Sequence, residues 1–172
     1  MYTYAAPHAH DANAIEALLD IAFGPGRLSR TSYRFRDGVA PVEDLALTAW
    51  HEKKLVGTIA YWPVRIGGNM TPALLLGPVA VEPSLRGQGI GVTLIRRTLA
   101  KARRRGHRVV VLVGDKDYYE RFGFSAAEPH GISMPGQAER LMVKALLPGA
   151  LDGVSGDIIS CRKGAGTAIH AA

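Results

Sequence analysis

The stretch "SLRGQGIGVTLIRRTLAKARRRG", residues 84–106, and the apolar run "VVVLVG", residues 109–114, together decide the fold of this chain. After the glycines, apolar side chains recur at helical spacing and basic side chains occupy the other positions, which predicts an amphipathic helix. The face that we expect to be buried comprises Leu94, Ile95, Thr98, Leu99 and Ala102. A continuous apolar run is typical of a strand buried on both faces. A strand ending near Glu82, this helix and that run therefore predict a parallel crossover in a mixed α/β fold.

The flanking segments add further strands and helices. "LALTAWH" and "LVGTIAYWPVRI" are joined by a short charged stretch and predict a hairpin, and "ALLLGPVAV" predicts a third antiparallel strand. We also expect a short first strand at residues 2–6, a helix capped by Asp11, a short helix in "KDYYERFGF" ending at Gly123, and a late strand in "ERLMVKALL". Residues 24–41 have no clean period, which predicts a loop with one short helix at most.

Length and composition predict one compact domain, because 172 residues lie near the prior of about 150 per domain. The single cysteine, Cys161, cannot form an internal disulfide, and we find neither a secretory signal nor an apolar run of roughly 18 to 20 residues. We therefore predict a cytoplasmic protein that does not enter a membrane. The domain is expected at residues 1–150, followed at residues 151–172 by a glycine-rich tail of little pattern and only partial order.

The three alternating glycines Gly87, Gly89 and Gly91 predict an anion site. A turn of this kind between a strand and a helix leaves several backbone N–H groups unpaired, and the helix dipole adds positive charge there. The expected ligand is phosphate or pyrophosphate. The spacing is not the dinucleotide fingerprint, since Val92 stands where a third glycine is needed, and the chain has no P-loop motif. NAD and ATP sites are therefore not favoured.

The loop matches the pattern R-x-x-G-x-G, and with its context it resembles the GNAT superfamily of acetyl-CoA-dependent N-acetyltransferases. The preceding "LLLGPVAVEPSLRGQGIG" and the later "YYERFGF" both look like the matching segments of that family. The resemblance covers roughly residues 3–147. It implies a mostly antiparallel central sheet flanked by helices, in which the strand of residues 73–81 and the strand of "VVVLVG" are parallel and splay apart. Gly77 and Pro78 are placed where a bulge would redirect the backbone.

The resemblance also implies acetyl-CoA as co-substrate and a set of cofactor-binding positions. In the family, the strand backbone pairs with the pantetheine arm, and the loop binds the pyrophosphate. The positions that carry over are Val79, Ala80, Val81, Arg86, Gly87, Gln88, Gly89, Ile90 and Gly91, with Tyr118 lining the groove. Asp115 contacts coenzyme A or caps the short helix. The N–H near Val79 would polarise the thioester carbonyl, where a fixed donor stabilises developing negative charge.

Tyr119 stands at the position of the general acid tyrosine of the family, since a phenol can protonate a thiolate leaving group. The ordinary alternative is a core tyrosine with its hydroxyl near water. No carboxylate carries over as general base, because Leu74, Leu75 and Leu76 fill the strand position some members use, and His51, Glu82, His130 or a water chain stay open. His8 and His10 have no supporting cysteine cluster, so we predict no metal site.

The predicted partners are acetyl-CoA and an acceptor with a primary amine, entering past residues 24–41, where Tyr33, Phe35 and nearby arginines would line its site. Eight of the 21 basic residues fall between Arg86 and Arg108, and the formal net charge is +6. A helix face this basic could follow a nucleic acid, but we favour a solvated face because it lacks interleaved aromatics. A regulatory domain that binds acetyl-CoA without turnover stays open, as does the choice of monomer or homodimer.

Overall fold

The computed structural model describes residues 1–137 and 139–162 of the chain. Its strands are β1 (Tyr2–Ala5), β2 (Leu47–His51), β3 (Lys54–Ile66), β4 (Thr71–Val81), β5 (Val109–Val113), β6 (Ser125–Ala126), β7 (Ile132–Ser133), β8 (Leu141–Ala145) and β9 (Gly156–Ser160). The sheet follows the order β1-β2-β3-β4-β5-β8-β6. Within this order β4 and β5 are parallel and the other neighbours are antiparallel. The predicted mixed, mostly antiparallel sheet in which β4 and β5 are parallel is confirmed.

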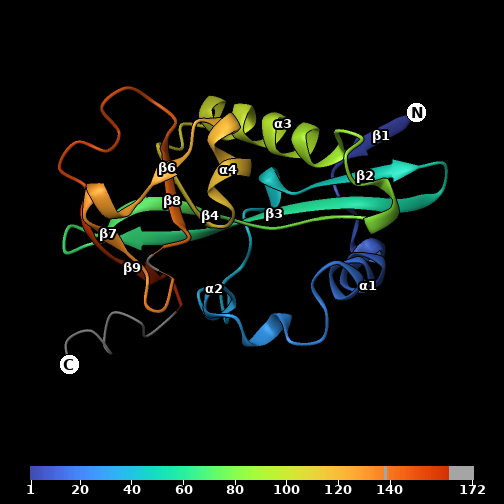
Figure 1. The fold of residues 1–172 in the computed structure, drawn as a ribbon, viewed down its shortest axis with the longest axis horizontal. Helices are drawn as coiled ribbons and strands as arrows, with labels where there is room; N and C mark the ends of the chain where they lie inside the picture. The colour runs from blue at the N-terminus through green and yellow to red at the C-terminus, as the bar shows by residue number, and fades with distance from the viewer. Residues whose placement is uncertain (138, 163–172) are drawn as a thin grey trace.

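Helices cover both faces of the sheet (Figure 1). They are α1 (Ala12–Phe23), α2 (Thr31–Arg34), α3 (Ile90–Arg104) and α4 (Lys116–Tyr119). α3 and α4 lie on one face, and α1 and α2 lie on the other. The sheet is therefore shielded on both sides, as the continuous apolar run of β5 requires.

The buried face of α3 is the one predicted from the sequence. Leu94, Ile95, Thr98, Leu99 and Ala102 are each between 0 and 7% exposed. Thr98 is the polar member of this face, and its hydroxyl donates to the carbonyl of Leu94 at 2.7 Å, while the hydroxyl of Tyr61 lies 2.8 Å from it. Because these buried hydroxyls have partners, the helix packs on the sheet without an unsatisfied polar group at this position.

β4 and β5 stay together over a short distance only. Their register joins Leu74 to Val110 and Leu75 to Val111, and β4 then continues to Val81 without β5 beside it. The register between β3 and β4 shifts at the same place, so that β4 has one residue more than β3. That extra residue falls at Gly77, whose φ of 131° favours glycine. The predicted bulge and the predicted splay of the two strands are confirmed.

The start of α1 differs from the prediction in one respect. Asp11 precedes Ala12, but its carboxylate makes no capping bond to α1. It accepts instead from the backbone N–H of His8 at 2.7 Å. A single 3-10 turn over residues 9–11 stands before the α-helix, so the aspartate satisfies the start of that turn rather than the start of α1.

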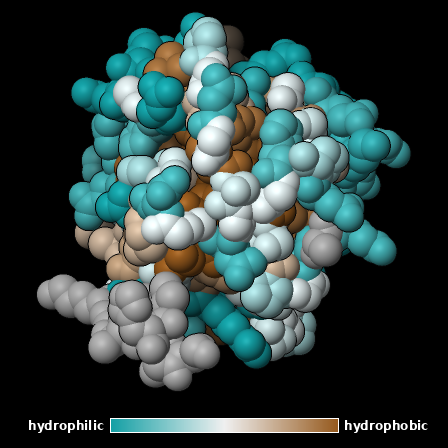
Figure 2. Space-filling model, turned by 90° about the vertical axis from the view of Figure 1, so that its left-hand side faces the viewer, coloured by the Kyte–Doolittle hydropathy of each residue, from teal (hydrophilic) through white to brown (hydrophobic). Residues whose placement is uncertain are grey.

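The last strand, β9, lies in the stretch after Pro148 where the sequence shows little pattern. It pairs antiparallel with residues 64–66 of β3 and parallel with β7. β2 pairs with β3 only as far as Ile59, so residues 64–66 offer an edge that β9 covers. The rest of the tail, residues 163–172, lies outside the described residues. Figure 2 views this end of the molecule and shows hydrophobic surface along the middle of a largely hydrophilic face.

Candidate functional site

A groove of about 700 Å³ opens where β4 and β5 separate. Its walls are the second half of β4, the loop before α3, the first turn of α3, the region of α4 and the end of α1. The residues proposed for cofactor binding or catalysis that line it are Val79, Ala80, Val81, Arg86, Gly87, Gly89, Ile90, Gly91, Asp115, Tyr118 and Tyr119. Three segments far apart in sequence are thus brought to one cavity. Their individual roles stay predictions.

Gln88 is the predicted site residue that does not line this groove. Its side-chain oxygen accepts a hydrogen bond from the hydroxyl of Tyr2 in β1. The side chain therefore ties the loop to the first strand, and the backbone N–H of Gln88 is the group left for an anion. Arg86 lies beside it with its side chain exposed to solvent.

The loop before α3 holds its glycines for two different reasons. Gly87 and Gly89 both have φ of 82°, a left-handed conformation that other residues adopt at a cost. Gly91 is helical, but a Cβ there would lie 3.1 Å from the hydroxyl of Tyr118. Two glycines are therefore set by backbone conformation and the third by close approach across the groove.

The same loop presents unpaired donors. None of the backbone N–H groups of residues 87–92 donates to an acceptor among residues 1–137 and 139–162. The first helical backbone hydrogen bond at this end of α3 joins the N–H of Thr93 to the carbonyl of Gly89 at 3.0 Å. These donors stand at the positive end of the α3 dipole, an arrangement that binds phosphate groups.

α4 places two tyrosines at the floor of the groove. Its N-cap is Asp115, whose carboxylate accepts from the N–H of Tyr118 at 3.3 Å, so the capping alternative for this residue is realised. The rings of Tyr118 and Tyr119 meet edge to face with centroids 5.0 Å apart. Burial, with the neighbouring Tyr118 as the next cause, raises the pKa of Tyr119 to about 12. Its hydroxyl therefore keeps its proton at neutral pH and is available as a donor.

Gly114, at the end of β5, makes room for Tyr119. A Cβ on Gly114 would lie 2.4 Å from Cε2 of the Tyr119 ring, closer than any packed contact allows. The ring also faces Phe124, with centroids 6.1 Å apart. The position of Tyr119 thus requires a glycine at position 114. The sequence motif around Tyr119 did not identify that requirement.

We predict that Gly114→Ala displaces Tyr119 and lowers the free energy of unfolding by about 1–3 kcal/mol, the usual cost of overpacking. Chemical denaturation measures this cost. Gly26→Ala is the control, because nothing lies within 4 Å of a Cβ there. Equal stability of the two variants would contradict the tight packing of Tyr119 against Gly114.

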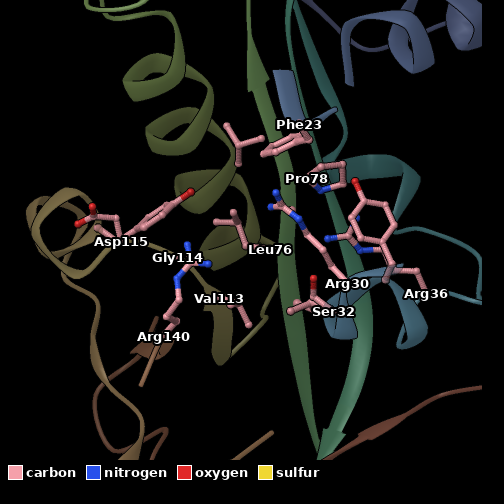
Figure 3. Close-up of a pocket in the computed structure, with 15 residues that line it drawn as sticks. Phe23, Arg30, Ser32, Arg36, Leu76, Pro78, Val113, Gly114, Asp115 and Arg140 are labelled. Carbon is pink, nitrogen blue, oxygen red and sulfur yellow. The ribbon is translucent and has the colours of Figure 1, made fainter. Parts of the chain in front are cut away.

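A second cavity of about 230 Å³ adjoins the groove (Figure 3). It shares Phe23, Val79, Asp115 and Tyr119 with the groove, so Tyr119 stands where the two meet. Part of its other wall comes from residues 30–36, which lie within the segment 24–41 predicted to border the acceptor. That acceptor role stays a prediction. Tyr33 lines this second cavity, whereas Phe35 packs against the core cluster around β3 and β8 instead.

The three candidates for general base lie elsewhere. His51 ends β2 with its ring tilted against the ring of Tyr2, and Glu82 pairs with Lys54 at 3.1 Å. His130 is exposed in a 3-10 turn. None of them lines either cavity. The carboxylate that does line both is Asp115. Among the described residues no group of three or more metal-ligating side chains occurs, and no helix is long and apolar enough to span a bilayer.

A family model and a curated relative both match most of this chain. Residues 5–127 match the family model described as an acetyltransferase (GNAT) domain. The uncharacterized N-acetyltransferase YhbS of Escherichia coli strain K12 is 31% identical over 148 residues, covering 85% of this chain and 88% of the relative.

Two solved structures are also similar. The crystal structure of YhbS from Escherichia coli in complex with CoA has a TM-score of 0.79 and 30% identity, covering 91% of this chain and 88% of that one. A GNAT family acetyltransferase from Brucella melitensis in complex with acetyl-CoA has a TM-score of 0.70 and 33% identity, covering 92% of this chain and 94% of that one.

Proposed function

This chain belongs to the GNAT acetyltransferase family, and from that premise we infer that it transfers the acetyl group of acetyl-CoA to a primary amine of an acceptor. The observation that carries the proposal is the groove between β4 and β5, which joins unpaired loop donors at one end to Tyr119 at the other. Two similar structures hold CoA and acetyl-CoA, which supports the same co-substrate here.

The residues of the groove fit such a co-substrate. The N–H groups of residues 87–92 would bind its pyrophosphate, and Arg86 adds positive charge beside them. The edge of β4 that β5 leaves at Leu75 would pair with the pantetheine arm as a further strand does. The N–H of Val79 would donate to the thioester carbonyl oxygen, where negative charge grows during attack.

The nitrogen of the neutral amine attacks the thioester carbonyl carbon, a C–N bond forms and the C–S bond breaks. The amine releases one proton to solvent, and the leaving sulfur receives one from the hydroxyl of Tyr119, which solvent then restores. The products are an N-acetyl amide and the free thiol of CoA. Since the second cavity opens on Tyr119, it is the place for the acceptor.

Direct attack needs no acyl-enzyme, so Cys161→Ala is expected to leave turnover unchanged. Cys161 follows β9 and lines neither the groove nor the second cavity. Steady-state release of CoA with any acetylated amine measures the effect. Loss of transfer together with an acetyl adduct on Cys161 by mass spectrometry would replace the ternary complex by a covalent mechanism.

The test of the function itself is a screen for release of CoA from acetyl-CoA in the presence of amines, amino acids, polyamines and peptides. An acetylated product identified by mass spectrometry would establish the enzyme. Binding of acetyl-CoA without transfer to any member of the panel would instead favour the regulatory domain.

A nucleic-acid function has no comparable support. Part of the basic face of α3 is engaged within the protein, because Lys101 and Arg105 both pair with Asp44, at 2.9 and 2.8 Å. Arg97 lies over the ring of Tyr4 at 4.6 Å. A cytoplasmic location, a monomer or homodimer, and a domain ending near residue 150 stay predictions.

A further inference from the structure

Arginines dominate the charge of the second cavity. Arg30 and Arg36 reach it from the segment around α2, and Arg140 reaches it from the opposite wall (Figure 3). The carboxylate among its lining residues is Asp115, which already accepts the N–H of Tyr118. The cavity beside the point of transfer is therefore positively charged.

Among the residues that the structure describes, none of the three arginines forms an ion pair. Two of them lie over aromatic rings: Arg30 lies over Phe23 at 5.4 Å, and Arg36 lies over Tyr33 at 4.1 Å. Nearby Arg27, by contrast, is paired with Asp20 at 2.8 Å and with Glu16.

Arg36 is the least satisfied of the three. Its Nε and Nη1 atoms are buried and have no hydrogen-bond partner among the described residues. Its Nη2 atom stands 3.2 Å from the place of a Cβ on Gly77, so the guanidinium lies against the bulge of β4. Burial lowers the pKa of Arg36. A buried guanidinium with unmatched donors costs free energy unless an anion meets it.

We propose that the acceptor is a small amine that also carries an anionic group, a carboxylate or a phosphate, bound in this cavity by Arg30, Arg36 and Arg140. The inference rests on the proposed acetyltransferase function and names the class of acceptor. Guanidinium groups bind carboxylate and phosphate through two parallel hydrogen bonds, which fixes orientation as well as charge. If Arg36 binds the anionic group of the acceptor, the amine of the same molecule is free to reach Tyr119, where the cavity and the groove meet.

The size of the cavity supports a small acceptor. Its volume of about 230 Å³ lies below the range of roughly 300 to 1,000 Å³ usual for drug-sized ligands. A positively charged wall disfavours polyamines, since a second ammonium group would lie near the guanidinium groups of all three arginines.

The first experiment compares matched pairs of amines by kcat/KM at saturating acetyl-CoA. β-Alanine is paired with propylamine and O-phosphoethanolamine with ethanolamine, so that each pair differs in the anionic group. Spermidine and a peptide with a blocked C-terminus complete the panel. We expect the anionic member of at least one pair to be favoured by about ten- to a hundredfold, the usual gain from a hydrogen bond to a charged group. The pair that shows the preference distinguishes carboxylate from phosphate.

The second experiment removes the charges one at a time. Arg36→Gln and Arg140→Gln are each expected to lower kcat/KM for the favoured anionic amine about ten- to a hundredfold and to lower it much less for the neutral partner, so that the ratio between the two members of the pair falls. Arg36→Lys keeps the positive charge but lacks the two parallel N–H donors of a guanidinium. Its kcat/KM for the anionic amine should lie between those of the wild type and Arg36→Gln. Arg103→Gln, on the exposed side of α3, removes one positive charge far from the cavity and is the control. Because Arg140 is exposed, Arg140→Gln should fold, and it tests the inference if Arg36→Gln does not fold.

Three results would overturn this inference while leaving the acetyltransferase in place; the first two concern specificity. One is a preference for neutral amines, spermidine or the blocked peptide, and the other is equal loss on both members of a pair in the arginine variants. If acetyl-CoA binds and no anionic amine is acetylated, and none binds to the CoA complex by calorimetry, the inference is also wrong. Failure of the wild-type protein to bind acetyl-CoA would overturn the proposed function itself.

Discussion

Gly89→Glu is expected to raise the dissociation constant for acetyl-CoA by about two orders of magnitude or more, equivalent to at least about 3 kcal/mol. Gly89 is the N-cap of α3, and its φ of 82° places it in the left-handed region. A glutamate there would add a side chain to the loop that presents the N–H donors of residues 87–92, and its carboxylate would repel the pyrophosphate that we propose those donors bind. Isothermal titration calorimetry with acetyl-CoA and CoA measures the loss, with NADH as a ligand not expected to bind.

The chain offers a matched control for this variant. Gly106, beyond the other end of α3, has φ of 86°, and a Cβ at either glycine meets nothing within 4 Å. Gly106→Glu therefore carries the same backbone strain and the same charge, but away from the groove, and should bind acetyl-CoA as the wild type does. Equal affinity in Gly89→Glu and Gly106→Glu would show that this loop does not hold the pyrophosphate.

Tyr119→Phe is expected to lower kcat by the roughly 10² to 10⁴ that a positioned proton donor contributes. The ring stays packed between Gly114 and Phe124, so the affinity for acetyl-CoA and the stability of the fold should change little. Because the pKa of Tyr119 is raised to about 12, its hydroxyl stays protonated up to about pH 10 and supplies no falling limb to the kcat profile below that pH.

Tyr118→Phe is the internal control for the general acid. Tyr118 also lines the groove, and its hydroxyl lies against Gly91, so a modest change in the KM for acetyl-CoA is expected, with a much smaller loss of kcat. A wild-type rate in Tyr119→Phe, measured where chemistry limits turnover, would assign proton delivery to water or another residue. The fold and the family would stand unchanged.

Much of this site was predictable because its parts are local patterns. The alternating glycines and the periodic face that buries Leu94 and Leu99 are written in consecutive residues, and they fixed the loop and α3. Gly77 and Pro78 interrupt an otherwise apolar strand, and the structure has its bulge there. Each of these features depends on backbone conformation or on a short period, which a single stretch of sequence can carry.

Other features depend on contacts between distant segments. β9 is weak by local pattern and forms because β3 leaves residues 64–66 uncovered. The sequence did not indicate that position 114 requires glycine. The requirement comes from the ring of Tyr119, which is five residues later in the chain and packs against Gly114 across a turn. Asp115 had two possible roles, and only the fold showed its carboxylate on the N–H of Tyr118.

The sequence by itself determined the β4–α3–β5 unit and the loop with its free donors, because periodicity, glycine conformation and strand breaks act within a few residues of each other. The tertiary structure alone decided which side chains face the proposed point of acetyl transfer. Arg36 and Arg140 are more than a hundred residues apart in the chain, and they meet in one cavity because residues 30–36 and the start of β8 close over the gap that β4 and β5 leave. The pattern of charges within one segment cannot predict that these two arginines line the same cavity, because that depends on how distant segments pack against each other.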